Sequence, residues 1–118
     1  MKDIRPPGKT TVAGDVLITI AKLTCLSVPG VSRMSPIPPG VSRLFKRGSE
    51  DGVEIIVENN IVYIDLYVVL QRDVIVRDVS HTIQNQVSRA INEMVDMEIG
   101  KIDIHIEDID YTTRQDDQ

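Results

Sequence analysis

The stretch Gly52–Leu70, GVEIIVENNIVYIDLYVVL, determines the fold that the sequence predicts. Two runs rich in β-branched residues flank Asn59 and Asn60, which tolerate the positive φ angles of a two-residue hairpin turn. We therefore expect a β-hairpin made of strands Gly52–Glu58 and Ile61–Leu70.

The predicted hairpin has one aliphatic face and one mixed face. A two-residue loop places Glu58 opposite Ile61, and alternate residues of each strand then share a face. The aliphatic face consists of Val53, Ile55, Val57, Val62, Ile64 and Leu66. The mixed face consists of Glu54, Ile56, Glu58, Ile61, Tyr63, Asp65 and Tyr67. The aliphatic face needs a second layer to cover it.

Two predicted helices can supply that layer. The first runs over Val16–Val28, with Asp15 as N-cap and Pro29-Gly30 as the stop signal. Its apolar stripe is Val16, Ile20, Leu23 and Ser27, with Leu17, Ala21, Thr24 and Val28 beside it. The second helix runs over Ile75–Met97, and its stripe is Val76, Val79, Ile83, Val87, Ala90, Ile91 and Met94.

A closing strand over Lys101–Ile109 alternates strictly between apolar and polar residues. Ile102, Ile104 and Ile106 share one face, while Lys101, Asp103, His105 and Glu107 share the other. The long helix before this strand favours a right-handed parallel crossover, and a short extended segment over Lys9–Ala13 precedes the first helix. The sequence thus predicts an α+β two-layer sandwich, with two main helices packed on one face of a small mixed sheet built around the β-hairpin.

The 118 residues fit a single domain. We expect a flexible N-terminus at 1–8, a domain at 9–109 that contains a Pro/Gly-rich basic loop at 29–51, and a flexible acidic tail at 110–118. No apolar run is long enough for a signal peptide or a membrane span, so we expect a cytoplasmic protein without an integral membrane segment.

Composition also narrows the function. A formal net charge of −5 argues against a general nucleic-acid binder, because phosphate contacts need a basic surface. Cys25 is the only cysteine, which excludes an intrachain disulfide and a cysteine-based zinc site. It lies in an apolar helical run, so we expect it to be buried and unreactive.

The mixed face of the hairpin is the first candidate for a site. Its carboxylates, together with Asp103 and His105, could hold a divalent metal near Glu54 and Asp65. The alternative, a solvated face, is favoured because strand spacing does not converge ligands on one point. The apolar and aromatic residues there are more than solubility requires. We expect either a protein interface or partial cover by the termini, and the interface residues are Ile56, Ile61, Tyr63, Asp65 and Tyr67.

The basic loop is the second candidate. The pentapeptide PGVSR occurs at 29–33 and again at 39–43, and the second copy leads into a basic, amphipathic turn. The side chains that could contact an anionic membrane or an acidic partner are Arg43, Leu44, Phe45, Lys46 and Arg47. Alternatively, Leu44 and Phe45 pack on the core and the charges are solvated. The loop also leaves open a KH-like nucleic-acid-binding module, although the acidic sheet face and the missing GXXG clamp argue against it.

Catalytic patterns are absent from the sequence. It has no Gly-x-Gly-x-x-Gly or Walker A motif, and neither His81 nor His105 has a context that places it beside a serine. We therefore expect no enzymatic activity, no metal and no cofactor.

Four segments carry a family resemblance: VPGV, the hairpin, VSHTIQNQVSRAINEMV and IGKIDIHIEDI. Together they resemble the alkaline shock protein family of bacterial envelope stress response proteins, across most of 9–109. The resemblance implies a small cytoplasmic protein without established catalytic activity. In that family some members self-associate and some lie at the inner face of the membrane through a membrane-anchored partner. We accordingly expect a non-enzymatic scaffold that forms homo-oligomers and binds protein partners, and no nucleic acid.

Overall fold

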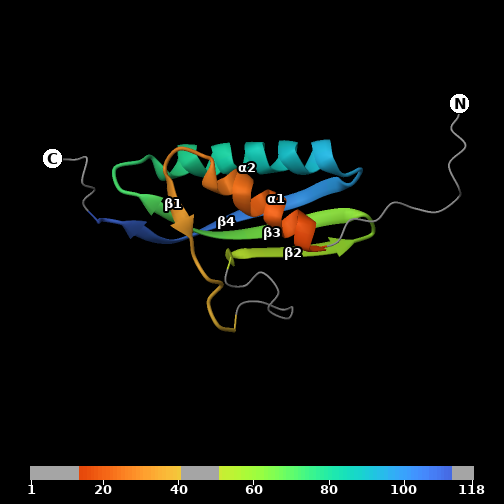
Figure 1. Ribbon diagram of the computed structural model, residues 1–118, viewed down its shortest axis with the longest axis horizontal. Helices are drawn as coiled ribbons and strands as arrows, with labels where there is room; N and C mark the ends of the chain where they lie inside the picture. Colours follow the sequence, from red (N-terminus) through yellow and green to blue (C-terminus); the bar gives the residue numbers. More distant parts are fainter. Residues whose placement is uncertain (1–13, 41–50, 113–118) are drawn as a thin grey trace, which may run out of the picture.

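The computed structural model describes residues 14–40 and 51–112 (Figure 1). Its elements in chain order are α1 Gly14–Leu26, β1 Val31–Met34, β2 Val53–Glu58, β3 Ile61–Gln71, α2 Val76–Met94 and β4 Glu98–Asp110. Both helices contribute side chains to one core against the sheet, which confirms the predicted two-layer α+β fold. The extended segment predicted over Lys9–Ala13 lies outside the described residues.

Strand β3 is the centre of a mixed sheet. Strand β4 pairs with it in parallel along one edge, from Ile61 to Gln71, as the predicted crossover required. Strands β2 and β1 pair antiparallel with the first and last parts of β3. Because β4 occupies one edge along the whole length of β3, β1 and β2 lie end to end on the other edge.

The hairpin has the predicted register, with Glu58 opposite Ile61 and Val53 opposite Leu66. Asn59 and Asn60 have φ angles of 54° and 65°. Both central turn residues are therefore left-handed, as a type I′ turn requires, and its twist matches that of the flanking strands.

The junction between β1 and β2 is organised by the backbone of Tyr67. Its carbonyl accepts a hydrogen bond from the Ser35 N–H, and its N–H donates to the Gly52 carbonyl, both at 2.8 Å. Assigning all of 29–51 to a loop was wrong, because Val31–Met34 forms a strand that pairs with the end of β3. The first PGVSR copy therefore ends a helix and begins this strand.

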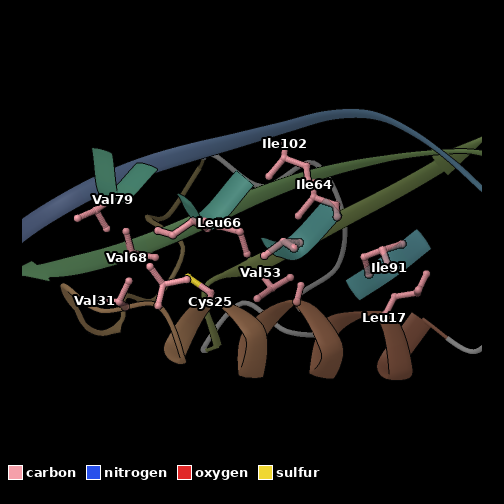
Figure 2. Close-up of a cluster of buried hydrophobic side chains, with 14 of the residues drawn as sticks. Leu17, Cys25, Val31, Val53, Ile64, Leu66, Val68, Val79, Ile91 and Ile102 are labelled. Carbon is pink, nitrogen blue, oxygen red and sulfur yellow. The ribbon is translucent and has the colours of Figure 1, made fainter. Parts of the chain in front are cut away.

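The core contains the aliphatic face of the sheet and one face of each helix. Its fully buried side chains include Val53, Val62, Ile64, Leu66, Val68, Leu70, Ile83, Val87 and Ile91. Figure 2 shows Leu17 and Cys25 reaching from α1 toward the strands. Burial raises the pKa of the Cys25 thiol to about 12, so the thiol stays protonated and inert, as its buried helical position predicted.

Helix α1 differs from its prediction in both its bounds and its buried face. Asp15 lies within the first turn rather than at the N-cap, and the helix ends at Leu26. The buried side chains are Leu17, Ala21 and Cys25. The predicted stripe faces outward instead, since Val16 and Leu23 are 46% and 60% exposed. The helix is apolar nearly all round, so periodicity alone could not select the face that packs.

Helix α2 and strand β4 follow their predicted faces with shifted ends. Val79, Ile83, Val87 and Ile91 are the buried side chains of α2, whereas Val76 and Met94 at its ends are exposed. Strand β4 is longer than predicted and reaches Asp110. Its pairing with β3 shifts at two bulges, one at Gly100 and one at Glu107. Between the bulges, the three isoleucines pack on the core side as expected.

Candidate functional site

The sheet face opposite the helices, which we call the open face, carries the predicted mixed set of side chains. The pairing aligns them in rows across the three strands. One row is Ile56, Tyr63 and Lys101, the next is Glu54, Asp65 and Asp103, and Tyr67 lies beside His105. The predicted juxtaposition of the Glu54 and Asp65 carboxylates is therefore present.

The centre of the open face is a stack of Tyr67 on His105. The ring centroids are 4.3 Å apart and the planes differ by 10°. The His105 Nε2 lies 2.9 Å from the Asp65 Oδ1, which ties β4 to β3 through a side-chain hydrogen bond. Tyr67 is only 3% exposed. Two of the five predicted interface residues, Asp65 and Tyr67, are thus engaged within the chain.

The electrostatics around Tyr67 are strongly acidic. Burial raises the pKa of its hydroxyl, and the charges of four surrounding carboxylates raise it further, in the order Asp65, Glu54, Glu107 and Asp103. The phenol therefore stays neutral at physiological pH and can donate a hydrogen bond. A neutral donor among acidic acceptors suits recognition of a cationic group, and it offers no activated nucleophile.

The metal hypothesis gains no support from the geometry. Among the described residues, no group of three or more His, Cys, Asp or Glu side chains is placed to hold a metal ion. Asp65 bonds to His105, and Asp103 lies 3.4 Å from the Lys101 ammonium. These carboxylates are therefore turned toward their neighbours on the sheet.

The remaining predicted interface residues, Ile56, Ile61 and Tyr63, form a half-buried apolar strip beside the acidic centre. Gly100 shapes this strip. A Cβ added there would lie 2.6 Å from the Tyr63 Cε1 and 2.7 Å from the Ile61 Cγ2. The bulge glycine therefore lets the two side chains lie against β4. The second candidate surface, Arg43, Leu44, Phe45, Lys46 and Arg47, falls outside the described residues.

A second polar cluster, which the sequence did not reveal, joins β1 to β4 across the end of β3. Asp110 Oδ2 accepts hydrogen bonds from the Ser32 hydroxyl at 2.7 Å and from the Arg33 Nη1 at 3.2 Å. Its Oδ1 accepts from the Thr112 N–H at 3.0 Å. The Ser32 hydrogen bond, followed by those from Thr112, lowers the pKa of Asp110 to about 2. The only sequence signal was a serine-arginine pair within a segment read as a loop.

Titration of Asp110 tests this cluster. The carboxyl pKa is lower in the folded chain than its ordinary value of 3.8. The stabilising contribution of the ionised group is therefore complete above about pH 4 and is lost as pH falls toward 2. We expect the side-chain carbon resonance of Asp110 to titrate with a midpoint near 2, and Ser32→Ala to raise that midpoint toward 3.8.

The control for this titration is Ser35→Ala, because the Ser35 hydroxyl donates to the Pro36 carbonyl and does not touch Asp110. It should leave the Asp110 midpoint unchanged. An Asp110 midpoint near 4 in the wild type would mean that the cluster does not form in solution.

Fold and site together define a small two-layer α+β domain with a covered core and an acidic, aromatic open face. The chain belongs to the alkaline shock protein family, a family with a cell envelope-related function, whose profile matches residues 3–111. This confirms the resemblance seen in the hairpin and the closing strand.

Two relatives come from Bacillus subtilis (strain 168). The uncharacterized protein YqhY is 28% identical over 109 residues, which cover 91% of this chain and 81% of the relative. The uncharacterized protein YloU is 18% identical over 109 residues, which cover 89% of this chain and 91% of the relative. No solved structure matches the chain significantly. In the described part of the chain, neither helix has the length and apolar character needed to cross a bilayer.

Proposed function

We propose that this protein is a non-enzymatic interaction protein of the cell envelope response, which self-associates and binds protein partners. It works in the cytoplasm at the inner face of the membrane, where a membrane-anchored partner holds it. The family's envelope-related function supports this proposal. So does the character of the open face, which resembles a recognition surface more than a reaction centre.

One observation carries the proposal: the apolar strip of Ile56, Ile61 and Tyr63 lies directly beside the acidic stack of Tyr67 and His105. Aromatic and aliphatic side chains next to fixed hydrogen-bonding groups are typical of protein interfaces, where the apolar part supplies burial and the polar part supplies specificity. The acidic surroundings favour a partner segment that presents arginine or lysine beside an apolar side chain.

The alternative of a KH-like nucleic-acid-binding module has less support. The open face concentrates Glu54, Asp65, Asp103 and Glu107 around a single tyrosine. Such a surface repels phosphate, so nucleic acid would have to bind elsewhere on the chain.

A photo-crosslinking experiment tests the partner-binding part of the proposal. The photoreactive residue p-benzoylphenylalanine replaces Tyr63 in the full-length protein, which is then expressed in the cells that normally make it. We expect irradiation to produce a defined protein adduct that fractionates with the cell envelope. The reason is that position 63 lies on the exposed apolar strip.

The matched control places the same photoreactive residue at Gln86, an exposed position of α2 on the other layer. It should give several-fold less adduct. Equal labelling from both positions, or no adduct from position 63, would contradict partner binding at the open face.

A further inference from the structure

The outer edge of β4 is a second surface that the open face does not explain. Strand β4 spans Glu98–Asp110, and in the part of the chain that the structure describes only β3 pairs with it. The Ile102 carbonyl accepts a hydrogen bond from the Gln84 side chain of α2 at 2.9 Å. A bond from the helix layer rather than from β3 indicates that this carbonyl faces the outer edge. Long edges with such free groups are templates for pairing with another strand.

The sequence of β4 is self-complementary in one antiparallel register. If Ile104 faces Ile104 of a second copy, opposite charges meet along the open face. In this arrangement Lys101 faces Glu107 of the second copy, and Asp103 faces His105. On the core side, Ile102 faces Ile106 and Ile99 faces Ile109. Opposite charges in directly facing positions stabilise antiparallel strands, and like charges destabilise them.

Neighbouring registers lose this complementarity. Centring the pair on Asp103 would place that carboxylate opposite its own copy and Lys101 opposite His105. Centring it on His105 would place Asp103 opposite Glu107. Registers that differ by one residue would bring apolar core positions opposite charged ones. Among these alternatives, only the register centred on Ile104 pairs opposite charges in each row.

The bulges of β4 fit the same symmetry. At one end Gly100 and Lys101 together oppose Tyr63, and at the other end Glu107 and Asp108 together oppose Val69. A two-fold axis through Ile104 brings Gly100 opposite Asp108 and Lys101 opposite Glu107. Each irregularity of one strand would therefore face an irregularity of the other, and the regular segment between them would pair with itself.

We infer that a second copy of this chain pairs with β4 antiparallel about Ile104, which extends the sheet continuously across two molecules. The inference rests on the self-association in the proposed function and identifies the surface that carries it. Pairing would also cover the partly buried Ile104 and Ile106 at the sheet edge, where they already pack against the core. The open face stays free for a different partner, because it lies on the plane of the sheet rather than at its edge.

A charge-swap experiment tests this pairing with the full-length protein. Lys101→Glu and Glu107→Lys each place like charges opposite one another in both symmetry-related rows. We expect either single variant to raise the dimer dissociation constant about tenfold or more, measured by sedimentation velocity at low salt. The two single variants mixed in equal amounts restore opposite charges in every row, so the mixture should associate like the wild type. The double variant should also recover.

The controls carry the same charge changes elsewhere: Arg89→Glu and Glu93→Lys on the exposed side of α2. Both should associate like the wild type. A wild type that is monomeric at every concentration would overturn the self-association in the proposed function together with this interface. Wild-type oligomers that the swaps leave unchanged would overturn the β4 pairing alone. Single variants that dissociate without recovery in the mixture would overturn the register centred on Ile104.

Discussion

Replacing Gly52 with alanine is expected to destabilise the protein by about 2–5 kcal/mol, the sum of a left-handed backbone penalty and a steric penalty. Gly52 has a φ of +72°, a conformation that residues with a Cβ rarely adopt. A Cβ added there would lie 2.3 Å from the Ser35 carbonyl oxygen and 2.6 Å from the Tyr67 carbonyl oxygen.

The neighbours of Gly52 cannot easily move. Its own carbonyl accepts the Tyr67 N–H, and the Tyr67 carbonyl accepts the Ser35 N–H. Both contacts are therefore backbone atoms at the point where β1, β2 and β3 meet. To relieve the clash, the chain would have to break the hydrogen bonds that hold two strands on the same edge of β3, so we expect the loss to be global rather than local.

Chemical denaturation followed by far-ultraviolet circular dichroism measures this loss. Gly40→Ala is the matched control, because Gly40 has a φ of +84° with no atom within 4 Å of an added Cβ. It should cost only the backbone penalty, about 1–2 kcal/mol. A Gly52→Ala variant no less stable than Gly40→Ala would contradict the close packing of the three strands at Tyr67.

The hairpin could be predicted from sequence to the residue because its determinants are local. Asn59-Asn60 specifies a two-residue turn, and a two-residue turn fixes every facing pair from Glu58 and Ile61 onward. The parallel placement of β4 followed from the length of the helix between β3 and β4. Neither conclusion needed information from distant parts of the chain.

Strand β1 and the packing of α1 could not be predicted in the same way. Val31–Met34 is a strand only because Val68, Val69 and Leu70 pair with it, and nothing in its Pro/Gly-rich surroundings indicates that contact. A sharper reading of those three consecutive apolar residues would have shown that the end of β3 is buried on both faces.

The candidate site was predicted in composition but not in geometry. Alternation placed Tyr63, Asp65 and Tyr67 on one face, which the register confirms. The stack of Tyr67 on His105 depends on the parallel register of β4, which two bulges shift. Periodicity cannot place a bulge, so it could not show which aromatic ring is covered and which lies on the surface.

Replacing Leu66 with alanine is expected to lower the free energy of unfolding by about 2–5 kcal/mol, the range for large-to-small changes in a packed core. Leu66 is fully buried in the central strand, opposite Val53 on one side and Ile104 on the other. Its neighbours belong to three strands that cannot collapse together into the space. Because a domain of this size has only about 5–15 kcal/mol of stability, the loss should be plain in urea denaturation curves.

The matched control, Leu23→Ala, removes the same atoms from α1, where the side chain is 60% exposed. It should change the free energy of unfolding by no more than about 0.5 kcal/mol, since alanine is at least as good a helix former as leucine. The comparison also decides which side of α1 packs. The helix is apolar on both sides, and its sequence pattern favoured the stripe that contains Leu23. The structure instead buries Leu17, Ala21 and Cys25. A Leu23→Ala loss as large as that of Leu66→Ala would therefore mean that α1 is rotated about its axis in solution.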